Sequence, residues 1–190
     1  MSTTKLRGIK GEYEVSEILK SDTSYHHALN NVVLVGGSGM THQIDHIVIR
    51  NNGVFCIETK NMPGDIKGTI VDNYWKQTNV HGNKIIEKTF HNPLKQNDSH
   101  RKILQRYLGD RYVYIPLVVF ASNNISNLKI PDVLDLKDLI DYISSYDSGV
   151  NYSKRQIDAI YEKLLKYRSN ITEQEHLNNI KNQKDENKIN

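Results

Sequence analysis

Hydrophobic residues along the chain form short continuous runs and longer stripes with helical spacing. Runs rich in Val, Ile, Leu, Phe and Tyr predict strands over residues 28–35, 43–50, 54–60 and 112–121. Weaker patterns predict strands at 68–75, 83–90 and 128–130, with the second pairing to the first. Stripes of apolar residues predict helices over 5–20, 92–108, 135–146 and 153–167.

The runs at 43–50 and 54–60 are apolar on both faces of the predicted strands. Because side chains alternate along a strand, each face is expected to carry its own set. A sheet that is apolar on both sides is covered on both sides. The first face is predicted to hold Ile47, Ile49, Val54 and Cys56, and the second to hold Ile44, Val48, Phe55 and Ile57.

Three charged residues, Asp45, Glu58 and Lys60, interrupt these two runs near their outer ends. If the first two residues of the Asn51–Gly53 linker form the hairpin loop, Asp45 lies opposite Glu58. If the last two form it, Asp45 lies opposite Lys60. Both registers place the three charges on one face, within cross-strand distance. A three-residue loop would break this parity unless a glycine bulge restored it.

Charges inside buried strands are costly unless they are paired or bind a metal. Two carboxylates and a lysine suit hydrolysis of phosphodiesters, because hard oxygen ligands favour Mg²⁺ or Mn²⁺. A bound ion activates water, and the lysine positions that water or stabilises the transition state. The alternative is a structural salt bridge between the strands.

The first predicted helix carries one acid, Glu12, on its apolar stripe, whereas Glu14 and Glu17 point elsewhere. Gly8 and Gly11 are expected to let this helix approach the sheet closely. Glu12 is therefore a candidate for the same site. A partly exposed helix acid is the alternative.

The helix predicted over 92–108 begins at Asn92-Pro93, with Asn as the N-cap and Pro in the first turn. It is expected to close at Gly109. Gln96 and His100 share one face and could meet a substrate near the helix N-terminus, where phosphate is favoured. An ordinary amphipathic helix with a polar first turn is the alternative.

The composition is that of a soluble protein with one core. The chain has 190 residues, a net charge of +3 and a single cysteine, Cys56, which is expected to be a buried core residue in a reducing cytoplasm. No apolar run is long enough to span a bilayer, so no membrane partner is expected. Basic residues are scattered rather than striped. Residues 169–190 are polar and predict a flexible tail.

Four short blocks follow one another along the chain: Gly8-Ile9-Lys10-Gly11-Glu12, Gln43-Ile44-Asp45-His46, Ile57-Glu58-Thr59-Lys60-Asn61 and Asn92-Pro93-Leu94-Lys95-Gln96. This ordered set resembles the nuclease-related domain (NERD), a branch of the PD-(D/E)xK nuclease-like superfamily. The resemblance covers residues 7–122, within an expected domain of residues 1–168.

The resemblance implies an α/β fold with a mixed central β-sheet flanked by helices and a restriction-endonuclease-like core. It implies that Asp45 and Glu58 are metal ligands, Lys60 is the catalytic lysine and Glu12 is an additional acid at the metal. Gln96 matches the helix glutamine that borders the site. Ile44 replaces the proline of the superfamily name, and this change removes no ligand.

Two functions from different classes follow. The first is a Mg²⁺- or Mn²⁺-dependent nuclease that acts on DNA, with RNA as the other substrate class. The second is a non-catalytic module that keeps the nuclease fold to bind nucleic acid or protein. The complete acid–acid–lysine set favours the enzyme. The small net charge and the missing basic stripe favour the module.

Overall fold

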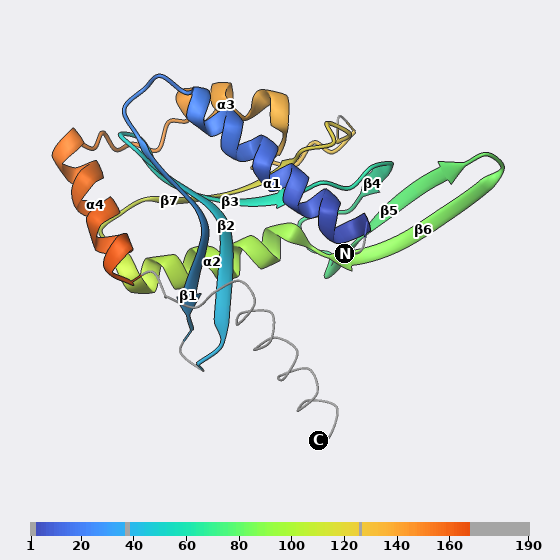
Figure 1. Cartoon of the computed structure of the whole chain (residues 1–190), viewed down its shortest axis with the longest axis horizontal. Helices are drawn as coiled ribbons and strands as arrows, with labels where there is room; N and C mark the ends of the chain where they lie inside the picture. The colour runs from blue at the N-terminus through green and yellow to red at the C-terminus, as the bar shows by residue number, and fades with distance from the viewer. Residues whose placement is uncertain (1–2, 37–38, 126, 168–190) are drawn as a thin grey trace.

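The structure is a computed structural model that describes residues 3–36, 39–125 and 127–167. Strands and helices follow one another along the whole of this part of the chain (Figure 1). The helices are α1 (Thr3–Ser21), α2 (Pro93–Leu108), the 3₁₀ helix η1 (Leu136–Asp138), α3 (Leu139–Ser145) and α4 (Lys154–Tyr167). The strands are β1 (His27–Val35), β2 (Thr41–Arg50), β3 (Gly53–Lys60), β4 (Asp65–Lys67), β5 (Tyr74–His81), β6 (Lys84–His91), β7 (Tyr114–Phe120) and β8 (Val133–Asp135).

A mixed five-stranded sheet forms the centre of the protein, with strand order β1-β2-β3-β7-β8. The first three strands are antiparallel neighbours, whereas β3, β7 and β8 run parallel. Pro116 lies in the part of β7 that precedes its pairing with β8. The predicted α/β class with a mixed sheet and flanking helices is confirmed.

Helices cover both faces of this sheet, as the apolar pattern of β2 and β3 requires (Figure 1). On one face α1 and α3 bury Val15, Leu19, Leu139 and Ile143 against Phe55, Ile57 and Leu117. On the other face α2 and α4 bury Leu104, Leu108, Ile157 and Ile160 against Ile47, Ile49 and Val54. Among the described helices, none is long and apolar enough to cross a membrane.

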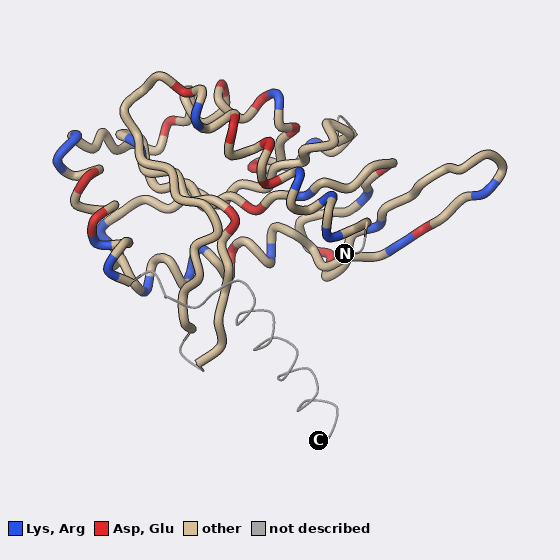
Figure 2. The backbone as a smooth tube through the Cα atoms, viewed as in Figure 1, with Lys and Arg blue, Asp and Glu red and all other residues tan. Residues whose placement is uncertain are grey.

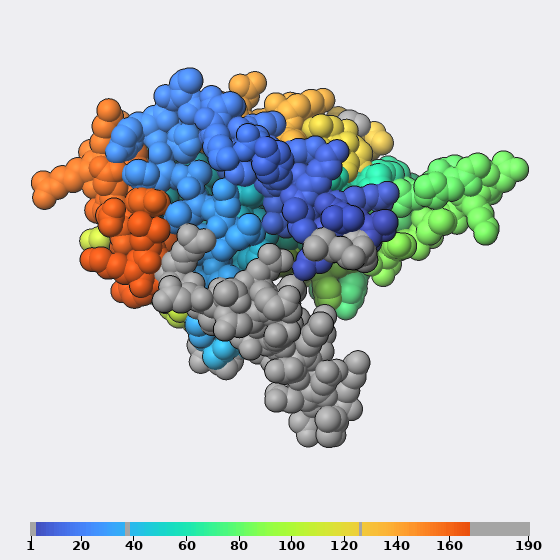
Figure 3. All heavy atoms as spheres, in the orientation of Figure 1, coloured from blue at the N-terminus to red at the C-terminus, as the bar shows by residue number. Residues whose placement is uncertain are grey.

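The second sheet, β4-β5-β6, is antiparallel and ends in a hairpin that projects from the body (Figure 3). The prediction of a strand over 68–75 is wrong, because β5 begins at Tyr74. Gly68 instead lies in a loop packed on the Trp75 indole, where a Cβ would approach within 2.3 Å. The strand predicted at 128–130 is also wrong, because the pairing with β7 falls at Val133–Asp135.

The alternation of side chains in β1 and β2 is interrupted at one register position. Asn31 and Asp45 lie opposite each other between regular pairs, and Asn31 has a positive φ of 52°. Ile44 was predicted to face Val48 and Phe55, but it packs with Ile47 and Ile49. The interruption places Ile44 on the face of Ile47 and Ile49, opposite to the face expected from regular alternation.

The helix predictions at the C-terminal end are confirmed as far as the described residues extend. Ser153 and Gln156 form the expected capping box: Ser153 N–H donates to Gln156 Oε1 at 2.9 Å, and Gln156 N–H donates to Ser153 Oγ at 3.4 Å. The tail predicted over residues 169–190 lies outside the described residues.

Candidate active site

The β2–β3 hairpin closes through a two-residue turn at Asn51-Asn52, because Arg50 pairs with Gly53. This is the first of the two registers considered above. The regular pairing ends at His46 opposite Ile57, and the same register continued by one residue would bring Asp45 opposite Glu58. The register that brings the two acids together is therefore the one that forms.

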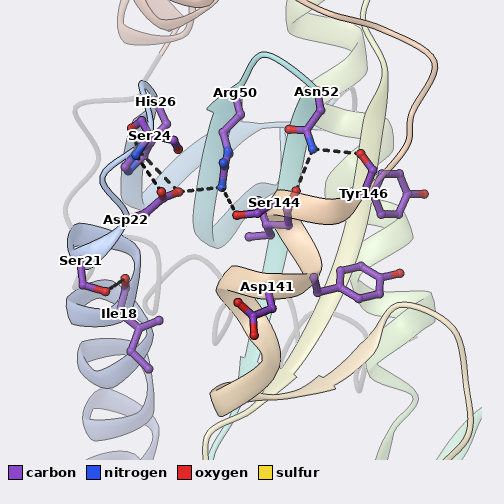
Figure 4. Close-up of polar contacts among 12 residues, drawn as sticks. Ile18, Ser21, Asp22, Ser24, His26, Arg50, Asn52, Asp141, Ser144 and Tyr146 are labelled. Atoms are coloured by element: carbon purple, nitrogen blue, oxygen red, sulfur yellow. Dashed lines mark hydrogen bonds and ion pairs between the residues drawn. The ribbon is translucent and has the colours of Figure 1, made fainter.

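Contacts with α1 and α3 hold the turn end of this hairpin (Figure 4). Asn52 Nδ2 donates to the carbonyl oxygens of Ile143 and Tyr146, at 2.7 and 3.0 Å. Arg50 Nη1 lies 2.6 Å from Asp22 Oδ2, and both side chains are buried. Because the hairpin is fixed at this end, its register is fixed at the end that carries the acids.

Asp45 lies where β2 separates from β3. Its Oδ2 accepts a hydrogen bond of 2.8 Å from the Thr59 backbone N–H, in place of strand pairing. Burial, and after it the charge of Glu58, raise the pKa of Asp45 well above its ordinary value. The Thr59 N–H and the Lys60 charge partly oppose this rise in pKa, and the charge of Glu12 adds to it.

Lys60 connects the hairpin to α2. Its Nζ donates to Glu58 Oε1 at 2.5 Å and to Gln96 Oε1 at 3.2 Å. The Glu58 side chain is only 3% exposed. Among the described residues, no group donates a hydrogen bond to Glu58 Oε2, and His100 Nδ1 lies 3.5 Å from it. One carboxylate oxygen of Glu58 thus keeps its full capacity to accept.

Glu12 acts on the site through its charge. The residue is half-buried and lines a pocket of about 460 Å³ with Gln43 and His46. Its charge raises the pKa of Asp45. Glu14 and Glu17 instead pair with Lys10 and Lys20 on the outer side of α1, at 3.6 and 2.7 Å, in line with the predicted helix face.

Gln96 and His100 lie on one face of α2, as the helix pattern predicted. They line a pocket of about 540 Å³ together with His42, Tyr74 and His91. Gln96 contacts Lys60, and the buried His100 lies beside Glu58. The two helices that cover opposite faces of the sheet therefore both contribute side chains at this end of it.

Two polar residues that position the site were not predicted. Asn97 is fully buried and donates to the carbonyl oxygens of Cys56 and Leu117, at 2.8 and 2.7 Å, so it links α2 to β3 and β7. It also accepts from the Cys56 thiol at 3.2 Å. Cys56 is a buried core residue, as expected, and burial is the main cause of its raised pKa.

His46 is the second such residue. It is 1% exposed, and its Nδ1 lies 2.7 Å from Asn30 Oδ1. Burial lowers its pKa to about 4, so the imidazole is neutral at pH 7. Its place directly after Asp45, within one of the four family blocks, is the signal that could have identified it.

The described side chains do not form a complete metal cage. No group of three or more His, Cys, Asp or Glu residues within the described ranges is arranged to hold an ion. The acids at the end of the hairpin therefore offer a partial set of oxygen ligands, contributed by Asp45 and Glu58.

The mixed sheet with helices on both faces defines an α/β protein with a restriction-endonuclease-like core. Residues 7–121 match the family model of the nuclease-related domain, NERD, and the chain belongs to this family. An uncharacterised protein of Bacillus anthracis is 33% identical over 178 residues, which are 90% of this chain and 80% of that protein. No solved structure matches the chain.

Proposed function

We propose that this nuclease-related protein is a divalent-metal-dependent nuclease that hydrolyses phosphodiester bonds in DNA. One observation carries the proposal: at the end of β3 Lys60 contacts Glu58, and Asp45 accepts from the backbone N–H of Thr59 between them. The Glu58 carboxylate there is buried, and within the described residues its Oε2 accepts no hydrogen bond. Buried polar atoms are normally satisfied, so this oxygen is suited to an external ligand.

The chemistry of the acids fits Mg²⁺ or Mn²⁺. Mg²⁺ is usually held by one or two carboxylates together with water and substrate phosphates rather than by an all-protein cage. Asp45 and Glu58 would supply these carboxylates, with Glu12 as the additional acid beside them. Burial, and after it the charges of Glu58 and Glu12, raise the pKa of Asp45, and a nearby cation would stabilise the charged form that these effects disfavour.

The remaining residues have roles that follow from their contacts. A bound divalent ion would neutralise charge on the phosphate and activate a water molecule. Lys60 would donate hydrogen bonds to that water or to the phosphate oxygen on which charge develops. Gln96 holds the Lys60 ammonium from α2 and thereby orients it.

A second candidate function is a binding module that has lost catalysis. The contact between Lys60 Nζ and Glu58 Oε1 at 2.5 Å favours it, because the two charges already neutralise each other. In that case the pair is structural and the nuclease fold serves only to hold a partner.

A nuclease assay combined with melting curves separates the two candidates. Purified protein is incubated with supercoiled plasmid, linear duplex and single-stranded RNA, in Mg²⁺, Mn²⁺ or EDTA. For an enzyme we expect metal-dependent cleavage of DNA and a higher melting temperature with Mg²⁺. The RNA arm tests the other substrate class.

Three variants assign the roles. Glu58→Gln should lose both cleavage and the Mg²⁺-induced rise in melting temperature. Lys60→Ala should lose cleavage but keep that rise, because lysine is not a ligand. Glu17→Gln, on the exposed side of α1, is the matched control and should keep both. If wild type shows neither cleavage nor Mg²⁺ stabilisation, and Glu58→Gln and Lys60→Ala both melt much earlier, the binding module is correct.

A further inference from the structure

A groove of about 390 Å³ runs between the N-terminal half of α1 and one face of the β5–β6 hairpin. We call it the arm groove. Figure 2 shows lysine and arginine positions on both of its walls, on α1 and along β6. Its lining includes Arg7, Asn61, Gln77, His81 and Lys88.

The two faces of the hairpin differ in charge. The register places Lys88 opposite Gln77 and Lys84 opposite His81, and these residues share the face toward the arm groove. The only acid of the hairpin, Glu87, lies on the other face, where it pairs with Lys76 at 3.2 Å. The groove side of the hairpin is therefore basic and contains no acid, while the opposite side is neutralised.

Three cations at the arm groove have no counter-charge in the described part of the chain. Arg7, Lys84 and Lys88 are exposed, and none of them forms an ion pair there. By contrast, Lys67 and Lys76, on the opposite side of the same small sheet, are paired with Asp65 and Glu87. Unpaired cations on two facing walls favour a ligand with repeated negative charges.

The arm groove borders the end of β3, next in the chain to the candidate active site. Its floor includes Asn61, the residue that follows Lys60. Asn61 Nδ2 donates to the Arg7 carbonyl oxygen at 3.0 Å, and its Oδ1 accepts from Ser122 Oγ at 2.8 Å. These contacts fix the groove wall on α1 relative to the end of β3. A strand lying in the groove thus passes the end of β3, one residue from Lys60.

We infer that the arm groove binds the phosphate backbone of one DNA strand and leads that strand to Lys60. The inference deepens the proposed function and rests on it for the identity of the partner. Phosphate contacts by lysine and arginine supply sequence-independent affinity that falls with salt. The projecting hairpin thereby provides the basic surface that the scattered charges of the sequence did not reveal.

Binding without cleavage tests this inference. Fluorescence anisotropy of labelled DNA is measured in EDTA across a series of salt concentrations, so that catalysis plays no part. The substrates are a duplex and a single strand of DNA, with an RNA strand and heparin as competing polyanions. Lys84→Gln/Lys88→Gln removes two charges from the groove face, and Lys67→Gln/Lys76→Gln removes two from the opposite side as the matched control. All four side chains are exposed or at the surface, so melting curves should match wild type.

The groove-face variant should bind DNA about tenfold more weakly at low salt. Its slope of log affinity against log salt should fall by about 1 for each lysine. The opposite-face variant should stay within about twofold of wild type. Adding Arg7→Gln should weaken binding again. Equal losses in the two variants, tighter binding of heparin or RNA than of DNA, or no DNA binding by wild type would overturn the inference.

Failure of the proposed catalysis is distinguishable from failure of this inference. If the protein never cleaves but binds DNA through Lys84 and Lys88, the arm-groove inference is supported and the proposed nuclease activity is refuted. If the protein cleaves, and the groove-face variant binds and cleaves like wild type, the proposed nuclease activity is supported and the arm-groove inference is refuted.

Discussion

Gly11 of α1 lies against Asn61, the first residue after β3, so closely that a Cβ at position 11 would be 2.6 Å from the Asn61 Cβ. This contact sets how near α1 approaches the sheet, and hence how near Glu12 comes to Asp45. Gly8, one turn earlier, has nothing within 4 Å of its would-be Cβ. The prediction of a close approach is therefore confirmed for Gly11 and wrong for Gly8.

Alanine at these two glycines should have opposite effects on stability. Gly8→Ala should stabilise the protein by up to about 1 kcal/mol, because alanine favours the helix. Gly11→Ala should destabilise it by about 1–3 kcal/mol, because the new methyl group must push α1 away from Asn61. Urea unfolding of the two variants measures the difference. A stabilised Gly11→Ala protein would contradict the close contact.

The charge on Asp45 should destabilise the metal-free protein at neutral pH. Its folded pKa is raised, chiefly by burial, so its contribution to stability is complete below its unfolded pKa of about 4 and is lost as the pH rises through the folded value. Asp45→Asn should therefore unfold at higher urea than wild type at pH 8 in EDTA, with little difference at pH 4. The prediction would be refuted if wild type, relative to Asp45→Asn, became more stable to urea from pH 4 to pH 8.

Asp22 should show the opposite dependence on pH. Burial acts to raise the pKa of Asp22, but hydrogen bonds from Ser24 and the charge of Arg50 outweigh it, so the pKa is lowered. Its contribution is present above the unfolded pKa of about 4 and is lost as the pH falls through the folded value. Asp22→Asn leaves the buried Arg50 without its partner and should cost about 3 kcal/mol at pH 7.

Replacing both members of this pair provides the control. Asp22→Asn/Arg50→Met removes the charge that Asp22→Asn alone leaves behind, so it should recover most of the lost stability. Urea unfolding at pH 7 and pH 3 measures both effects. A double variant as unstable as the single one would show that the cost does not come from the unpaired Arg50.

Asn97 should contribute to stability through its two backbone contacts. Asn97→Ala leaves the Cys56 and Leu117 carbonyl groups without their side-chain donor, and each unsatisfied buried group costs about 1–3 kcal/mol. We expect a loss of about 2–4 kcal/mol in urea unfolding. Ser99→Ala, exposed on the same helix, should change stability by less than about 0.5 kcal/mol. Similar values for the two variants would contradict the anchoring role of Asn97.

Local patterns in the sequence predicted the hairpin and the helix faces because the information lies within a few residues. With a two-residue loop, the apolar runs of β2 and β3 allowed two registers, both of which group Asp45, Glu58 and Lys60, whereas a three-residue loop would have broken this grouping. The choice between these forms depends on contacts of the turn with α3, more than 90 residues away, as for Asn52 and Ile143. No local pattern contains that information.

The failures have the same origin. The strand β5 begins at Tyr74, and Gly68 lies in a loop that packs on the Trp75 indole, so the predicted strand started too early. Asn97 reads as one polar residue on a polar helix, and its role depends on two carbonyl groups of separate strands. The basic face of the β5–β6 hairpin can be recognised only from the strand register, which places Glu87 on the face opposite to Lys84 and Lys88.

The two hairpins should differ in how they tolerate changes of length during evolution. Because side chains alternate along a strand, one residue inserted between Asn51 and Asn52 would reverse the face of every residue on one side of the turn. Such an insertion would separate Asp45 from Glu58. The turn at Gly82, at the exposed end of the other hairpin, has no neighbour within 4 Å of its would-be Cβ. Natural variants should therefore keep the first turn at two residues and vary freely in length at the second.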